Sequence, residues 1–98
     1  MKIPNKVKIG WKTYKVKQKS ATQTLIKEPE ALCGSIYYDY QEIYINKDFN
    51  KKHQKAVLIH EVVHGISEMY GLDFDEKTVT TFSNGLNTAI KDNPQLFK

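Results

Sequence analysis

A segment of helical periodicity between Asn50 and Gly71 constrains the fold of this chain more than any other feature. Its apolar side chains recur about every 3.6 residues, so on a helical wheel they fall within an arc of roughly 140°. They are Leu58, Ile59, Val62, Val63, Ile66, Met69 and Tyr70. The pattern predicts one long helix with a definite buried face. A glycine at position 71 is well placed to end this helix in the left-handed conformation.

The same helix carries the sequence H-E-V-V-H at residues 60–64. Side chains four residues apart lie on one face of a helix, about 6 Å apart along the axis, so His60 and His64 can reach one metal ion. Zinc binds neutral histidine nitrogens, and a catalytic zinc site normally has three protein ligands and a water. Glu61 lies about 100° around the helix from His60 and can approach that water without ligating the metal. The spacing predicts a metal-bound water activated by Glu61 as general base, which is chemistry that hydrolyses peptide or amide bonds.

The alternative interpretation of the motif is a helix with two solvent-facing histidines and with Glu61 as a surface charge. A position in mid-helix, on one face, with a second helix close enough to add a ligand, favours zinc over this alternative. The motif residues are expected to point away from the main apolar stripe. His53 lies on the same arc but about 10 Å from His60 along the axis, too far to share the ion, so it is interpreted as a surface residue.

A second helix is predicted to open at Asp73, because Asp73 and Glu76 have the spacing of a capping box. It runs to about Lys91, and Pro94 prevents its continuation. Two roles remain open for Glu76: the third ligand of the metal, or the partner of Asp73 in the cap. Asp75 is interpreted as a first-turn charge that the helix dipole favours.

Two hairpins are predicted ahead of the helices. Val7–Ile9 and Thr13–Lys17 alternate polar and apolar residues and are joined through a turn at Gly10. Ser35–Tyr38 and Glu42–Ile45 are rich in β-branched and aromatic residues and form the second hairpin. The predicted fold class is therefore α+β, with a small antiparallel sheet of two hairpins packed on the H-E-V-V-H helix and on a second, C-terminal helix.

Length and composition favour a single domain over residues 1–98, because no repeat or boundary is visible. The one cysteine, Cys33, excludes an intrachain disulfide and favours a reducing compartment, so a cytoplasmic location is expected. A small buried thiol is its expected role. The apolar runs are too short to span a bilayer, and neither membrane insertion nor a targeting signal is expected.

A formal net charge of +4 and an isoelectric point of about 9.1 raise the question of nucleic acid. The basic residues are concentrated between Lys2 and Lys19 at nearly alternating positions. Such a pattern is typical of a half-exposed strand, and lysines on an outer strand also discourage edge pairing. It favours a solvated strand face over a nucleic-acid patch, so nucleic acid is not expected among the partners.

With these elements in place, the chain resembles the small phage-type zincins allied to the ImmA/IrrE metallopeptidases. The resemblance covers most of the chain and is carried by residues 7–10, 14–16, 33–36, 43–45, 58–66, 79–86 and 92–94. It implies a minimal zincin fold and a zinc-dependent metallopeptidase with His60 and His64 as metal ligands and Glu61 as general base. The expected partner is a protein or peptide substrate, such as a repressor or a host protein. An extended peptide would add to an exposed sheet edge, for which Glu42–Ile45 is the expected strand.

The chain departs from this family at the third metal ligand. The family has a glutamate on the second helix, and the corresponding position here is Thr80, whose neutral hydroxyl is a poor zinc ligand. Glu76 lies one helical turn earlier on the same face, so the expected ligands of Zn²⁺ are His60, His64 and Glu76. The alternative is a degenerate zincin that acts as a non-catalytic protein-binding or regulatory module of phage origin.

Overall fold

The computed structural model describes residues 3–20 and 33–97. Four strands are followed by two α-helices and a short 3-10 helix: β1 (Lys6–Ile9), β2 (Lys12–Lys19), β3 (Gly34–Tyr37), β4 (Glu42–Asn46), α2 (Lys51–Tyr70), α3 (Glu76–Asp92) and η2 (Pro94–Phe97). The strands and helices lie where the sequence predicts them, with boundaries that differ by a few residues. The α+β fold class is confirmed.

The four strands form one sheet in the order β1-β2-β4-β3. Pairing is antiparallel within each hairpin, as predicted, but β2 and β4 run parallel with Lys15 opposite Glu42, so the sheet is mixed. This arrangement also places β4 inside the sheet, between β2 and β3. Glu42–Ile45 is therefore not an exposed edge, and the edges of the described sheet are β1 and β3. Pairing between hairpins is a long-range contact, which alternation within a strand does not reveal.

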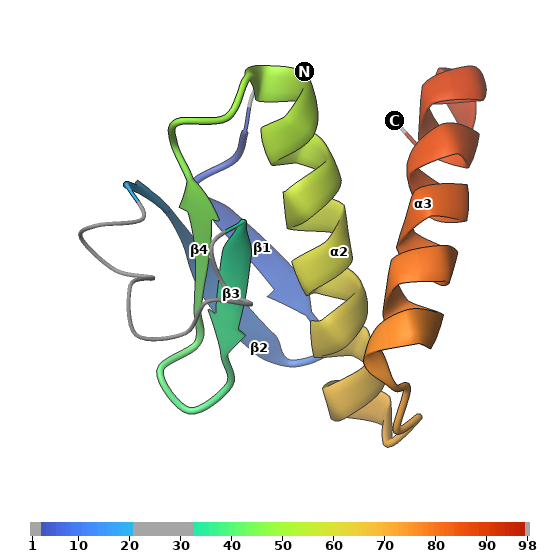
Figure 1. Cartoon of the computed structure of the whole chain (residues 1–98). Coiled ribbons are helices and arrows are strands. Elements are labelled where there is room, and N and C mark those ends of the chain that lie inside the picture. The colour runs from blue at the N-terminus through green and yellow to red at the C-terminus, as the bar shows by residue number, and fades with distance from the viewer. Residues whose placement is uncertain (1–2, 21–32, 98) are drawn as a thin grey trace.

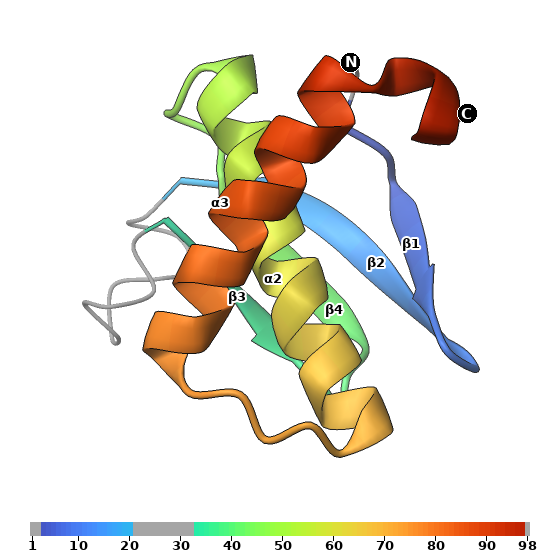
Figure 2. The same cartoon turned by 90° about the vertical axis from the view of Figure 1, so that its right-hand side faces the viewer.

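Both helices lie on the same side of the sheet, as Figure 1 shows. Helix α2 packs directly against β1, β3 and β4, and α3 packs on the outside of α2. In Figure 2 α3 crosses in front of α2, which separates it from the sheet. Because α3 is supported mainly by α2, only Val79 and Ser83 of α3 are buried.

The hydrophobic core lies between α2 and the sheet. Strands β2 and β4 contribute its three fully buried residues, Tyr14, Ile43 and Ile45, and α2 contributes Val57 and Leu58. The predicted apolar stripe of α2 is largely confirmed, since Leu58, Ile59 and Val63 are buried and Val62, Ile66 and Met69 are partly buried. Tyr70, in contrast, is 63% exposed at the last turn of the helix.

Helix α2 has caps at both of its ends. The Asn50 side chain accepts a hydrogen bond from the backbone N–H of His53 at 2.8 Å, and Gly71 ends the helix at φ 65°. The predicted role of Gly71 is confirmed, because a left-handed residue lets the last turn close its hydrogen bonds. Neither α2 nor any other helix in residues 3–20 and 33–97 is long and apolar enough to cross a membrane.

Candidate metal centre

Helix α2 presents two histidine rings to α3. His60 and His64 are four residues apart, their ring centroids are 4.9 Å apart, and the rings are inclined by 67°. Both side chains are between one fifth and one quarter exposed. The shared helix face predicted from the H-E-V-V-H spacing is therefore present, and it faces the second helix rather than open solvent.

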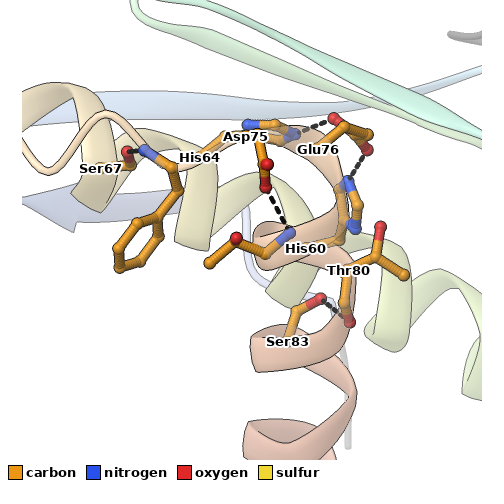
Figure 3. Close-up of polar contacts among 9 residues, drawn as sticks. His60, His64, Ser67, Asp75, Glu76, Thr80 and Ser83 are labelled. Carbon is orange, nitrogen blue, oxygen red and sulfur yellow. Dashed lines mark hydrogen bonds and ion pairs between the residues drawn. The ribbon is translucent and has the colours of Figure 1, made fainter.

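Glu76, the first residue of α3, joins the two histidines. Its Oε1 lies 2.8 Å from Nε2 of His60, and its Oε2 lies 2.9 Å from Nε2 of His64. Figure 3 shows the single carboxylate spanning both rings. One ligand atom from each of the three residues can be chosen so that all lie within 4.8 Å of one another, close enough to bind one metal ion.

The start of α3 explains why this carboxylate is free to face α2. The capping box predicted for Asp73 and Glu76 does not form, because Asp73 has a left-handed backbone at φ 56°. Asp75 is the N-cap instead, and its Oδ1 accepts a hydrogen bond from the N–H of Thr78 at 2.8 Å. The helix thus starts later than predicted, so Glu76 takes no part in the cap and its side chain reaches the histidines.

Thr80 lies one turn further along α3 and lines the same cavity as the histidines. It is exposed and does not belong to the His60–His64–Glu76 cluster, as Figure 3 shows. Its backbone carbonyl accepts a hydrogen bond from the Ser83 hydroxyl at 3.2 Å. Of the two positions considered for a third ligand, the structure brings Glu76 to the histidines.

Glu61 is far more buried than the sequence predicts, with only 6% of the residue exposed. Its side chain lies beneath Gly34, the first residue of β3. The approach is close, because a Cβ added to Gly34 would be 3.6 Å from Oε2 of Glu61. Burial raises the pKa of Glu61 to about 8, and the negative charge of Glu76 acts in the same direction. The expectation that the motif points away from the core is therefore wrong for Glu61, because the sheet edge covers this side of α2.

Burial has the opposite effect on a histidine, because it again disfavours the charged form. The pKa of His64 is lowered chiefly by burial, and the neighbouring Glu76 charge opposes this only in part. The neutral imidazole that results is the form that ligates metal ions. Two imidazoles and one carboxylate are a donor set that zinc commonly takes, so these residues fit a zinc ion.

A cavity of about 630 Å³ opens beside the cluster, between α2, α3 and the start of β3. Its lining includes Glu61, the three clustered residues, and also Cys33, Gly34, His53, Ala56, Val57, Thr80, Ser83 and Asn84. Cys33 is a free, exposed cysteine, so the expected buried thiol is wrong: the residue precedes β3 and lies outside the core. His53 is exposed and stacks on Phe49 with ring centroids 4.2 Å apart, in agreement with a surface position.

A second cavity of about 340 Å³ lies on the other side of His64 and includes Tyr38 in its wall. Burial raises the pKa of Tyr38, and the charge of Glu61 contributes next. The sequence does not single out this tyrosine among its neighbours, because only the packing of the β3–β4 hairpin against α2 brings it near the cluster.

Compared with family models, with curated proteins and with solved structures, the chain matches none of them.

Proposed function

We propose that this protein is a zinc-dependent metallopeptidase of the small zincin type that hydrolyses peptide bonds in cytoplasmic protein or peptide substrates. The observation that carries the proposal is the convergence of His60, His64 and Glu76, with their ligand atoms within 4.8 Å of one another. A buried carboxylate from the same H-E-V-V-H motif, Glu61, lies in the wall of the adjoining cavity. A metal site and a proton acceptor are thus next to a space that can admit substrate.

The roles follow from the position of each side chain. A zinc ion held by His60, His64 and Glu76 would polarise the scissile carbonyl and lower the pKa of water to about 7. Glu61 accepts the proton of the attacking water and passes it to the amine that leaves. This step requires Glu61 to be ionised. Burial and the Glu76 charge raise the pKa of Glu61, whereas a zinc ion bound nearby would lower it.

The substrate chain would pair with β3, the edge strand of the described sheet nearest the cluster. Gly34 at the start of β3 lines the same cavity as Glu61 and the histidines, and α2 packs directly against this strand. An edge strand has unpaired backbone groups that bind an extended peptide by main-chain hydrogen bonds. Pairing along β3 therefore holds a peptide bond beside the metal centre.

The experiment combines metal content with hydrolysis. The purified protein is expected to hold one zinc ion per chain by mass spectrometry and to cleave members of a peptide library. Glu61→Gln should retain the zinc but lower hydrolysis by at least about 100-fold, because the amide cannot accept the proton. Glu68→Gln is the matched control, since this residue lies two turns later on α2, is exposed and pairs with Lys12. Absence of zinc, or hydrolysis by Glu61→Gln at the normal rate, would contradict the proposal.

A second candidate function is a zincin-like module that binds a protein without cleaving it. Two observations favour it: Thr80 stands where the resembling family has its glutamate, and the Glu76 side chain is 69% exposed. Zinc binding by Glu76→Ala and by Thr80→Glu distinguishes the two functions. If the protein is a peptidase, Glu76→Ala should lose its zinc. If it is a binding module, the normal protein should hold little zinc and Thr80→Glu should bind more of it.

A further inference from the structure

The face of the sheet opposite α2 carries a concentration of lysines. Alternation along β1 and β2 turns Tyr14 and Val16 into the core and leaves five lysines on the other face: Lys6, Lys8, Lys15, Lys17 and Lys19. Both described helices lie on the core side of the sheet, as Figure 1 shows. Among the described strand residues of this face, one is acidic: Glu42 of β4. Its carboxylate forms an ion pair with Lys17 at 2.8 Å. Five lysines and one glutamate give the strand residues of this face a net charge of +4, which equals the formal net charge of the whole chain.

Protection of a sheet edge does not explain these lysines. The explanation suits Lys6 and Lys8, because β1 is an edge strand. It fails for the lysines of β2, which is an inner strand between β1 and β4. Moreover, Lys6 lies directly opposite Lys15 in the register. Like charges in such a cross-strand pair are destabilising, so the arrangement costs stability unless an anion binds there.

Tyrosine rings continue the basic surface across β4 and β3. Lys17 Nζ lies 5.9 Å from the centre of the Tyr44 ring, and the Tyr44 and Tyr37 rings meet edge to face with centroids 5.5 Å apart. Tyr40, which is 76% exposed, lies 6.4 Å from Tyr37 between centroids. We call the surface formed by Lys6, Lys8, Lys15, Lys17, Lys19, Tyr37, Tyr40 and Tyr44 the lysine–tyrosine face.

We propose that the lysine–tyrosine face binds single-stranded nucleic acid. Lysines at alternate positions of a strand are about 6.6 Å apart and form a row of positive charge along which a phosphate backbone can lie. The adjoining rings offer surfaces on which bases stack without regard to sequence. A duplex would hide its base faces from these rings, and an acidic peptide or an anionic membrane would need the lysines but not the rings. This binding is separate from the metal centre, which lies on the other side of the sheet.

The binding experiment measures the anisotropy of a fluorescent oligothymidylate with the full-length protein. Lys8→Glu/Lys15→Glu is expected to weaken binding by at least about tenfold and to reduce the slope of log affinity against log salt by about two. Lys52→Glu/Lys55→Glu, on α2, changes the net charge equally and should change the affinity by less than about twofold if only the sheet face binds. Thermal unfolding of both variants checks that they are folded, and EDTA should leave binding unchanged. Equal weakening by the two double variants would overturn the proposal.

Tyr37→Leu separates nucleic acid from other anions. It keeps an apolar side chain on β3 but removes the ring, so affinity for oligothymidylate should fall several-fold while affinity for heparin, an anionic polymer without bases, stays the same. If Tyr37→Leu binds oligothymidylate normally, or if heparin or phosphatidylserine vesicles bind more tightly than oligothymidylate, the face is a general anion or membrane surface. Either result would refute the assignment to nucleic acid.

Discussion

Glu61 and Glu76 are carboxylates of one site in opposite environments. Glu61 is 6% exposed beneath β3, whereas the Glu76 side chain is 69% exposed at the start of α3. Burial disfavours the charged form, so the pKa of Glu61 rises to about 8. An exposed carboxylate at the mouth of the site suits metal ligation, and a buried one suits proton transfer because its pKa lies near neutrality.

The buried Glu61 should make the stability of the metal-free protein depend on pH. Its pKa is about 8 when folded and near 4.5 when unfolded, so the folded state binds more protons between these values. The free energy of unfolding should therefore decrease as pH rises from about 5 to about 8, by a few kcal/mol at most. Urea unfolding in EDTA at several pH values measures this change.

Glu61→Gln is the control for this pH dependence, because a neutral amide should remove the decrease. The lowered pKa of His64 acts in the opposite sense below pH 6.5, where the unfolded state binds more protons. That effect is common to both proteins and cancels when they are compared. Parallel stability curves for the two proteins would show that Glu61 titrates normally in the folded state.

Among the elements, α3 depends on a cap that the sequence assigns to another residue. Both Asp73 and Asp75 are suitable N-caps by residue type, and their spacing to Glu76 favours Asp73. In the structure Asp73 is left-handed and Asp75 caps the helix, which moves the first turn by two residues. This shift decides where the Glu76 carboxylate lies, because a glutamate engaged in a capping box turns back to the N–H of the N-cap residue instead of toward the histidines.

Removal of the α3 cap should therefore weaken metal binding as well as stability. Asp75→Ala is expected to destabilise the protein and to lower zinc affinity several-fold, because Glu76 then lies in a frayed first turn. Asn50→Ala removes the equivalent cap of α2, far from the cluster in sequence, and should cost a similar free energy without changing zinc affinity. Zinc titration against a competing chelator and urea unfolding measure the two quantities. Equal zinc affinities in the two variants would contradict this coupling.

At the scale of the whole molecule, α3 is the least supported layer. The sheet and α2 share the core, whereas α3 packs on α2 and buries only Val79 and Ser83. In Figure 2 it lies as an outer layer across α2. A metal ion bound by His60, His64 and Glu76 would link α2 to α3, so the metal would contribute to the docking of the outer helix.

Hydrogen exchange tests this contribution directly. Zinc at 100 times its dissociation constant stabilises the metal-bound state by about 2.7 kcal/mol, which corresponds to roughly 100-fold slower exchange where opening releases the metal. The amides of α3 should therefore exchange much faster after EDTA treatment. Amides of β2 and β4, which hold the core, serve as the internal control and should change less. Uniform acceleration across the chain would mean that the metal stabilises the fold as one unit.

The parts of this structure that the sequence predicts correctly have local causes. The hairpin at Gly10, the helix end at Gly71 and the apolar stripe through Leu58 and Val63 depend on residues close together in the chain. The common face of His60 and His64 depends only on the pitch of an α-helix. Periodicity and local backbone preference were sufficient for each of these features.

Tertiary contacts decide the remainder, because they join segments that have no local signal for each other. The parallel pairing of β2 with β4 removes Glu42–Ile45 from the edge and gathers the lysines beside the tyrosines. Packing of β3 on α2 buries Glu61, and the late start of α3 brings Glu76 to the histidines. The sequence by itself determined that His60 and His64 share one face of a helix, through helix pitch. Only the tertiary structure decided that Glu61 is buried, that Glu76 joins the two histidines and that the lysine–tyrosine face forms on the opposite side of the sheet. These features depend on how the elements pack.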